Sequence, residues 1–219
     1  MKGELYDLSQ KFQTGMTTTK SLGPFERTVI QDLDHNPCQL SKIGFVSHMG
    51  CHLDAPRHYY KEGLTIGDIP VSRLCAPCVV IDAQKGAHGL ITVEDVLASG
   101  LEIQSGDFVF FCTGWEDYFA DNDPMFFEGA SLSEELAQYL VDKGVGMVGI
   151  DTCTVDLAHS QRPADFQFPI HRKLLSNNVL IAECLRLRQV VGKRLRVYAL
   201  PMYIDQCDGA PLRAVGVEL

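Results

Sequence analysis

The chain has no long hydrophobic run and no excess of basic residues. No apolar stretch approaches the ~18 residues that a membrane-spanning helix needs, and the opening Met-Lys-Gly-Glu-Leu-Tyr-Asp contains no apolar core of a secretory signal. Its 19 lysines and arginines stand against 28 aspartates and glutamates, which gives a net charge of −9. Because no basic cluster is long enough to follow a phosphate backbone, we expect neither a membrane nor a nucleic acid as a partner.

Several common catalytic and binding motifs are also absent. The sequence contains no Gly-x-Ser-x-Gly, so a nucleophilic serine of that type is excluded. Gly146 and Gly149 lie in a strand-like run, but the third glycine and the following helix of a dinucleotide-binding fingerprint are missing. Cys153 and His159 are the residue types of a Cys–His dyad, yet nothing in the sequence brings them together.

The eight cysteines are too sparse for a small disulfide scaffold. We therefore expect a cytoplasmic protein with reduced thiols. Cys75 and Cys78 form the one CxxC, which is typical of a redox pair or of half a zinc site. Because Val79-Val80-Ile81 follows at once, as in a buried strand, we favour buried, inert thiols.

Length and hydrophobic patterning predict the fold class. With 219 residues, of which 46% are hydrophobic, the chain is long enough for one sizeable core, so we predict a single domain over residues 1–219. Many strands and few helices favour a mixed, strand-rich α/β or α+β architecture. The strand-like runs are residues 4–8, 26–33, 39–48, 77–83, 107–113, 145–151, 178–184, 194–200 and 212–218.

Three helices are predicted from their end signals. The first spans residues 92–98, because Thr92 is a good N-cap and acids follow it. The second spans residues 131–143, with a capping box of Ser131 and Glu134 and an end at Gly144. The third begins at Pro169, a residue suited to a first helical turn, and runs to about residue 175.

The most informative segment runs from His48 to His58 and reads His-Met-Gly-Cys-His-Leu-Asp-Ala-Pro-Arg-His. His48, His52 and Asp54 offer two imidazoles and a carboxylate, a ligand set that suits zinc, manganese or iron(II). His58 is left over nearby, with a ring that can carry a proton near neutral pH. We therefore predict a metal site with a proton-transfer group beside it.

The spacing of these residues favours an extended backbone. Side chains of a strand alternate between its two faces, so positions 48, 50, 52 and 54 would point to one side, where Gly50 leaves room for a metal and a substrate. A helix would align His48 with His52 but would turn Asp54 to another face, and the glycine and proline of the segment disfavour a helix. Cys51 would lie on the face opposite to the ligands.

Residues 165–183 offer two further candidate ligands. His171 stands near the start of the predicted third helix. Glu183 lies near the end of an apolar strand, where a buried acid needs a partner. A metal ion would be such a partner, and a salt bridge to Arg186 or Arg188 is the alternative.

Over nearly its whole length the chain resembles the metal-dependent hydrolases of the cyclase family, which includes bacterial kynurenine formamidase and isatin hydrolase. The hallmark of that family, His-x-Gly-Thr-His-x-Asp-x-Pro-x-His, matches His48 to His58 except that Cys51 replaces the threonine. Further matching pieces are the twelve-residue spacing from His171 to Glu183, and Asp7-Leu8-Ser9, Thr113-Gly114-Trp115 and Gly149-Ile150-Asp151-Thr152.

The resemblance implies a swivelling β/β/α domain that forms homodimers or higher oligomers such as tetramers. It also implies two divalent ions per subunit, zinc or manganese. One ion would be bound by His48, His52 and Asp54. Asp54 would bridge to a second ion, which His171 and Glu183 would hold.

The same resemblance makes His58 the catalytic acid/base. A bound divalent ion lowers the pKa of its water to about 7, so metal-bound hydroxide would attack a carbonyl while His58 takes up a proton and returns it to the leaving nitrogen. We therefore expect hydrolysis of an amide, with N-formylkynurenine, an intermediate of tryptophan catabolism, as the leading substrate. Cys51 affects fine tuning, since a thiol donates more weakly than a hydroxyl; recruitment of Cys51 as an extra ligand stays open.

The identity of the substrate is left open by the sequence. Candidates for an aromatic-lined pocket are Tyr59, Tyr60, Trp115, Phe126 and Phe127. Kynurenine formamidases carry a Trp-Pro-Gly-Asp-like segment after the opening Asp-x-Ser, where this chain has Gly-Met-Thr-Thr-Thr-Lys at residues 15–20. A cyclic amide, imide or lactone, as for isatin hydrolase, is the alternative substrate. An iron(II) oxygenase and a catalytically silent metal-binding protein are the alternatives from other classes.

Overall fold

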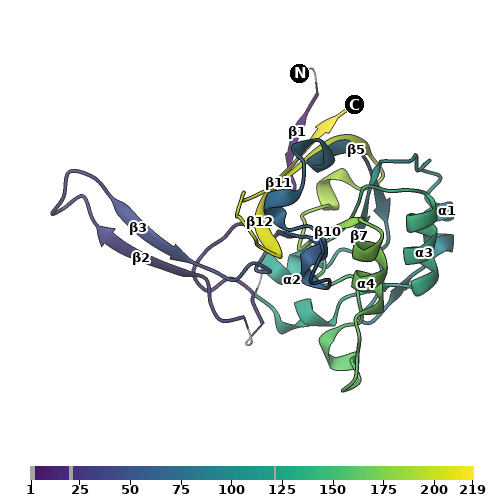
Figure 1. Cartoon of the computed structure of the whole chain (residues 1–219), viewed down its shortest axis with the longest axis horizontal. Coiled ribbons are helices and arrows are strands. Elements are labelled where there is room, and N and C mark those ends of the chain that lie inside the picture. The colour runs from purple at the N-terminus through teal and green to yellow at the C-terminus, as the bar shows by residue number, and fades with distance from the viewer. Residues whose placement is uncertain (1–2, 20–21, 121) are drawn as a thin grey trace.

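The computed structural model describes residues 3–19, 22–120 and 122–219 of the chain (Figure 1). The strands are β1 (Leu5–Asp7), β2 (Glu26–Gln31), β3 (Leu40–Gly44), β4 (His52–Asp54), β5 (Cys75–Asp82), β6 (Leu90–Ile91), β7 (Phe108–Cys112), β8 (Ser131–Leu132), β9 (Met147–Ile150), β10 (Leu180–Glu183), β11 (Arg194–Pro201) and β12 (Gly209–Glu218). The α-helices are α1 (Val93–Ala98), α2 (Glu116–Ala120), α3 (Glu134–Asp142) and α4 (Pro169–Ser176). The 3₁₀ helices are η1 (Pro56–His58), η2 (Ile66–Asp68), η3 (Val71–Leu74), η4 (Pro124–Glu128), η5 (His159–Gln161) and η6 (Arg188–Val190).

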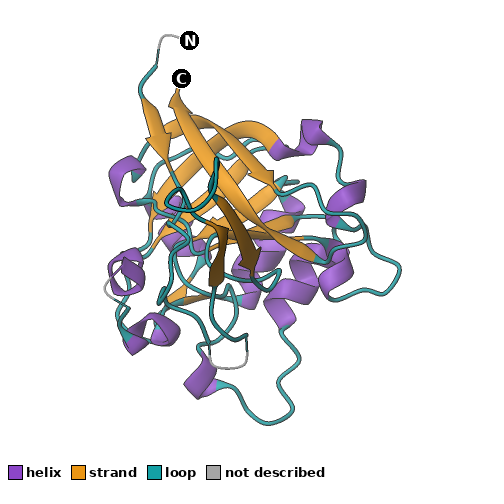
Figure 2. Ribbon diagram, turned by 90° about the vertical axis from the view of Figure 1, so that its left-hand side faces the viewer, coloured by secondary structure: helices purple, strands orange, loops and turns teal. Residues whose placement is uncertain are grey.

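The main sheet closes on itself. Its strand order is β1-β12-β11-β5-β7-β9-β10-β4, and β4 also pairs with β12, so all of these strands except β1 form a barrel. The neighbours β5, β7, β9 and β10 are parallel to one another, whereas the other pairs are antiparallel. Both views show the first and last strands of the chain side by side (Figures 1 and 2). The short strand β4 is therefore the element that completes the barrel.

The parallel strands bury both of their faces. In β5, Cys78 and Val80 belong to the hydrophobic core that fills the barrel interior, and every strand of the barrel contributes side chains to this core. Val79 and Ile81 point the other way, into a second core shared with α1, α3 and α4. A strand covered on both sides reads as a continuous apolar run, which is why the parallel strands stand out in the sequence.

The hairpin of β2 and β3 stands away from the barrel as an arm (Figure 1). It exposes the large apolar side chains of Val29, Ile30, Leu40 and Ile43 to solvent. A two-stranded hairpin alone is marginally stable in water, so this arm has little internal support. None of the described helices is long and apolar enough to span a membrane.

The predicted mixed, strand-rich fold is confirmed, and the structure corrects its details. The strand predicted at residues 39–48 ends at Gly44, and the backbone is irregular until β4 begins at His52. The helix predicted from Ser131 begins at Glu134 instead, because the Ser133 hydroxyl accepts the N–H of Leu136 and acts as the N-cap. The extended backbone predicted around His52 and Asp54 is present as β4, whereas the sequence analysis missed the short elements α2, β6 and β8.

Candidate active site

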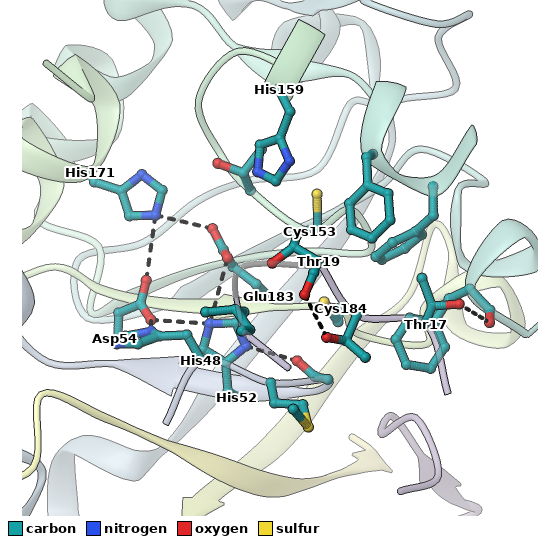
Figure 3. A pocket seen from close by; sticks show the side chains of 18 of the residues that line it. Thr17, Thr19, His48, His52, Asp54, Cys153, His159, His171, Glu183 and Cys184 are labelled. Carbon is teal, nitrogen blue, oxygen red and sulfur yellow. Dashed lines mark hydrogen bonds and ion pairs between the residues drawn. The ribbon is translucent and has the colours of Figure 1, made fainter. Parts of the chain in front are cut away.

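Four buried side chains meet where β4 closes the barrel (Figure 3). His52 and Asp54 are two positions apart on β4 and share a face, while Leu53 between them packs into the barrel core. Glu183, the last residue of β10, is the ladder partner of His52. His171 lies in the first turn of α4, which packs against this side of the sheet.

The lone pair of His52 faces two carboxylates. Its Nδ1 lies 2.8 Å from the Gly50 carbonyl oxygen, so Nδ1–H is the donor, and in the neutral ring Nε2 carries the lone pair. That Nε2 is 3.3 Å from Asp54 Oδ1 and 3.6 Å from Glu183 Oε2. A lone pair and two anions repel one another unless a cation lies between them.

His171 approaches the same two carboxylates from the other side. Its Nδ1 is 2.6 Å from Asp156 Oδ2, and its Nε2 is 3.5 Å from Asp54 Oδ2 and 3.2 Å from Glu183 Oε1. Each carboxylate thus turns one oxygen toward His52 and the other toward His171. Among the described residues, Asp54 Oδ2 is the one buried side-chain oxygen or nitrogen that has no hydrogen bond.

His48 reaches the site from a loop, so its placement on a strand with His52 was wrong. Its Nδ1 is 2.7 Å from Asp54 Oδ1 and its Nε2 is 2.8 Å from Asp208 Oδ2. The chain turns at Gly50, whose φ is +58°, a conformation that favours glycine. A Cβ there would lie 2.8 Å from the Met16 side chain, so the glycine serves the turn and close packing.

His58, the last residue of η1, lies against His48. The two ring centroids are 3.8 Å apart, and His58 Nδ1 is 3.1 Å from the same Asp208 oxygen that contacts His48. Burial lowers the pKa of His58 below its usual value, which favours the neutral ring. Burial also acts to lower the pKa of His48, but the attraction of Asp54 and Asp208 overrides it and raises that pKa to about 10.

The donor set fits a divalent metal. Ligand atoms of His52, Asp54 and Glu183 lie within 4.8 Å of one another, as do those of His48, Asp54 and His58. Imidazole nitrogens and carboxylate oxygens are ligands of zinc and manganese. The second trio includes His58, which the sequence analysis assigned to proton transfer.

The protonation of His171 points the same way. Burial acts to lower its pKa, but the nearby carboxylates of Asp156, Asp54 and Glu183 raise that pKa well above its usual value. The carboxylates around His171 therefore favour a positive charge at this place, and a bound divalent cation would displace a proton from the ring.

The alternative prediction for Glu183, a salt bridge to Arg186 or Arg188, is wrong. Among the described ion pairs, Glu183 is matched with His52 and His171, while Arg188 is matched with Asp117. The Val155 N–H also donates to Glu183 Oε1 at 3.0 Å. The acid at the end of β10 is therefore turned to the histidines.

A cavity of about 310 Å³ opens beside these residues. Three of the predicted aromatic residues, Tyr59, Phe126 and Phe127, line it, together with Phe119, Phe168 and Thr17–Thr19. The other two do not line it: the Tyr60 hydroxyl donates to the Arg172 carbonyl, and Trp115 packs behind the lining residues Phe119 and Phe126. Thr17–Thr19 belong to the segment 15–20 that departs from the formamidase pattern, in which Lys20 lies outside the described residues.

Of the cysteines near the site, Cys51 and Cys184 are buried and Cys153 is half-buried. Cys51 is fully buried in the barrel core, on the other side from the ligands, and burial raises its pKa to about 12. Cys153 and His159 both line the cavity, which the sequence gave no reason to expect. Burial raises the pKa of Cys153 to about 12 as well, so it is not the thiolate of a dyad. In the CxxC, Cys78 is fully buried but Cys75 is only half-buried.

The sequence analysis missed two acids. Asp156 holds His171 and also accepts the backbone N–H groups of Ile170 and His171, which caps α4. Asp208 holds His48 and His58 from the residue just before β12. Asp208 stands in an Asp-Gly pair before a strand, a turn signal, whereas no local pattern distinguishes Asp156.

Comparisons with known proteins find similar sequences over most of the chain. A family model described as "Putative cyclase" matches residues 6–157. A kynurenine formamidase of Erythrobacter litoralis is 29% identical over 218 residues, covering 98% of this chain and 94% of that protein. One of Delftia acidovorans is 30% identical over 185 residues, covering 82% of this chain and 80% of that protein.

Solved structures with the same fold extend over the whole chain. A structure described as a "predicted metal-dependent hydrolase" of Bacillus stearothermophilus is 32% identical with a TM-score of 0.80, covering 99% of this chain and 98% of that one. Isatin hydrolase A of Ralstonia solanacearum has a TM-score of 0.88 at 24% identity, covering 99% of this chain and 92% of that one.

Proposed function

Because the chain belongs to the family described as "Putative cyclase", we propose that it is a metal-dependent hydrolase of amide C–N bonds, acting on aryl formamides. The convergence of His52 Nε2 and His171 Nε2 on the carboxylates of Asp54 and Glu183 carries this proposal. The names of the kynurenine formamidases to which the chain is similar support the choice of N-formylkynurenine as the leading substrate.

We propose two divalent ions per subunit, zinc or manganese. His48, His52 and Asp54 would hold one, and Asp54, His171 and Glu183 would hold the other. The two Asp54 oxygens face different histidines, which supports a bridging role. When bound, such ions polarise a carbonyl and lower the pKa of water to about 7.

His58 would act as the acid/base. Its Nδ1 faces Asp208, so Nδ1–H donates to that carboxylate and the lone pair is left on Nε2. The neutral ring can take a proton from the attacking water and return it to the leaving nitrogen. Return of the proton matters because an amine anion is a poor leaving group.

A cyclic amide or lactone is the second candidate substrate. Threonines 17–19 line the cavity in the segment where kynurenine formamidases carry a Trp-Pro-Gly-Asp-like sequence. Hydrolysis of N-formylkynurenine and of isatin by the same metal-loaded preparation separates the two substrate classes. An iron(II) oxygenase requires oxygen, so turnover under anaerobic conditions excludes that alternative.

The decisive experiment measures kynurenine release from N-formylkynurenine, with a chelated control. Turnover that chelation abolishes supports the proposal, whereas turnover that survives full metal removal contradicts it.

His58→Ala should lose turnover but keep its metal, which also separates the enzyme from a silent metal-binding protein. Asp54→Ala should lose both ions, and retention of one full equivalent would count against bridging.

We propose that the chain forms homo-oligomers, dimers or tetramers, through the arm of β2 and β3. Val29 and Ile30 are 44% and 58% exposed there, and a second copy would cover them. Light scattering should show a smaller mass for the Val29→Lys, Ile30→Lys variant. The matched control is Leu97→Lys, at an exposed apolar position of α1. An unchanged mass in the arm variant contradicts this role.

We also propose that the protein is located in the cytoplasm. All eight cysteines are free in the structure, as expected of a reducing compartment. Fractionation of expressing cells tests it, since recovery of the protein in the secreted fraction would contradict it.

A further inference from the structure

Arg162 is the only lysine or arginine among the described residues that line the cavity. It directly follows η5 and is half-buried. Its Nε donates to the Leu157 carbonyl at 2.8 Å, and its Nη2 donates to Thr154 Oγ1 at 3.2 Å. Both partners are neutral, so they orient the guanidinium without compensating its charge.

The guanidinium is also held by two aromatic rings. Its central carbon lies 4.9 Å from the ring centroid of Phe168 and 5.7 Å from that of Phe166. Contacts of this kind fix a planar cation and leave its edge free to bind. The position of the charge is therefore set before any ligand arrives.

No carboxylate of the described residues forms an ion pair with Arg162. Arg188, Arg194 and Arg213 each face a carboxylate at 2.6–2.9 Å. Arginine has five N–H donors in a planar fork, of which Leu157 and Thr154 engage only part. An arginine that is oriented, half-buried and without an acid partner is suited to bind an anion from outside the protein.

Two of the residues that contact Arg162, Thr154 and Phe168, are close in sequence to residues at the candidate metal site. Thr154 precedes Val155, whose N–H donates to Glu183. Phe168 precedes α4, which carries His171 in its first turn. A substrate whose amide lies at the metal ligands would extend along the aromatic residues that line the cavity, such as Phe168, toward Arg162.

We propose that Arg162 is the anion subsite of this cavity and binds a carboxylate group of the substrate. This inference rests on the proposed function, because it assigns a substrate group to the same cavity. The planar fork of the guanidinium matches a carboxylate in a bidentate geometry.

The test compares formanilide with 2- and 3-formamidobenzoate, which differ from it by one carboxylate. The measured quantity is the ratio of kcat/KM for the better carboxylated substrate to that for formanilide, in metal-loaded protein. We expect the wild-type ratio to exceed about 10, and Arg162→Met to lower it about tenfold, mainly through KM. Arg162→Lys should give an intermediate ratio, because it keeps the charge and loses the fork.

Arg188→Met is the matched control, since Arg188 pairs with Asp117 and does not line the cavity. It should leave the ratio unchanged. A wild-type ratio near 1, or an equal ratio in wild type and Arg162→Met, would overturn the subsite.

If no formamide is hydrolysed, the proposed function fails and binding decides the subsite separately. Calorimetry of benzoate and benzamide with wild type and Arg162→Met then gives the answer. Weaker benzoate binding in the variant, with benzamide binding unchanged, supports the subsite. Equal benzoate binding in both proteins overturns it.

Discussion

Replacement of Asp208 by Asn should weaken metal binding and slow turnover together. One carboxylate oxygen of Asp208 contacts His48 Nε2 at 2.8 Å and His58 Nδ1 at 3.1 Å. The hydrogen bond from His48 is the main cause that holds the pKa of Asp208 below its usual value. Asp208 thus keeps both rings in the orientation that turns their other nitrogens to the site.

The size of the effect follows from these contacts. Loss of a carboxylate behind a metal-ligating histidine typically costs 10–100-fold in metal affinity or activity. The side chain of Asp208 is 38% exposed, so water compensates in part and we take the lower end of that range. We therefore expect about a tenfold loss of metal affinity and a similar loss of kcat for Asp208→Asn.

Chelator competition measures the metal affinity, and steady-state kinetics of the loaded protein measure kcat. Asp205→Asn is the matched control, because Asp205 is an exposed acid of the same loop that does not line the cavity. Wild-type affinity and wild-type kcat in Asp208→Asn would refute the reasoning that this carboxylate positions His48 and His58.

Three further predictions concern buried acids and the metal. Burial raises the pKa of Asp151 to about 6 although Thr113 donates to it, so the stability that Asp151 contributes is full below the unfolded pKa and is lost as pH rises through 6. Between pH 5 and pH 7, denaturant titration should show that the free energy of unfolding falls by about 1.4 kcal/mol more in wild type than in Asp151→Asn. Equal falls in the two proteins would contradict this. Asp156→Asn should weaken metal binding about tenfold by releasing His171, and unchanged binding in chelator competition would disprove the contact's role. Metal at 100 times its Kd should stabilise the fold by about 2.7 kcal/mol, so thermal unfolding that is unchanged by chelation would exclude a bound metal in the native state.

The ligand types were predictable because they are concentrated in one short segment. His52 and Asp54 share a face of β4 as period-2 alternation requires. The same rule failed for His48, since a positive φ at Gly50 ends any regular alternation. Local pattern thus predicts which residues gather but not the path by which the backbone brings them.

The supporting acids were not predictable, because their roles depend on tertiary packing. Asp208 follows His48 by 160 residues and reaches it only because β12 pairs with β4. Asp156 meets His171 only after α4 packs beside β10. Barrel closure depends on tertiary contacts, and the sequence pattern of a three-residue strand is too short to predict it.

The short strand β4 makes barrel closure and assembly of the site the same event, which Gly209→Ala tests. Gly209 begins β12 and is the ladder partner of Asp54. A Cβ on Gly209 would lie 2.5 Å from His48 Cε1 and 3.0 Å from its Nδ1. The ring cannot yield freely, because Asp54 and Asp208 hold it on both sides.

Overpacking of this kind typically costs about 1–3 kcal/mol. Gly209→Ala should therefore displace His48, with metal affinity reduced about tenfold or more and a lower melting temperature of the metal-free protein. The matched control is Gly86→Ala, where a Cβ meets nothing within 4 Å and φ is not positive. If Gly209→Ala keeps full metal affinity, His48 does not need its position between the two acids, and the coupling of the barrel seam to the site is wrong.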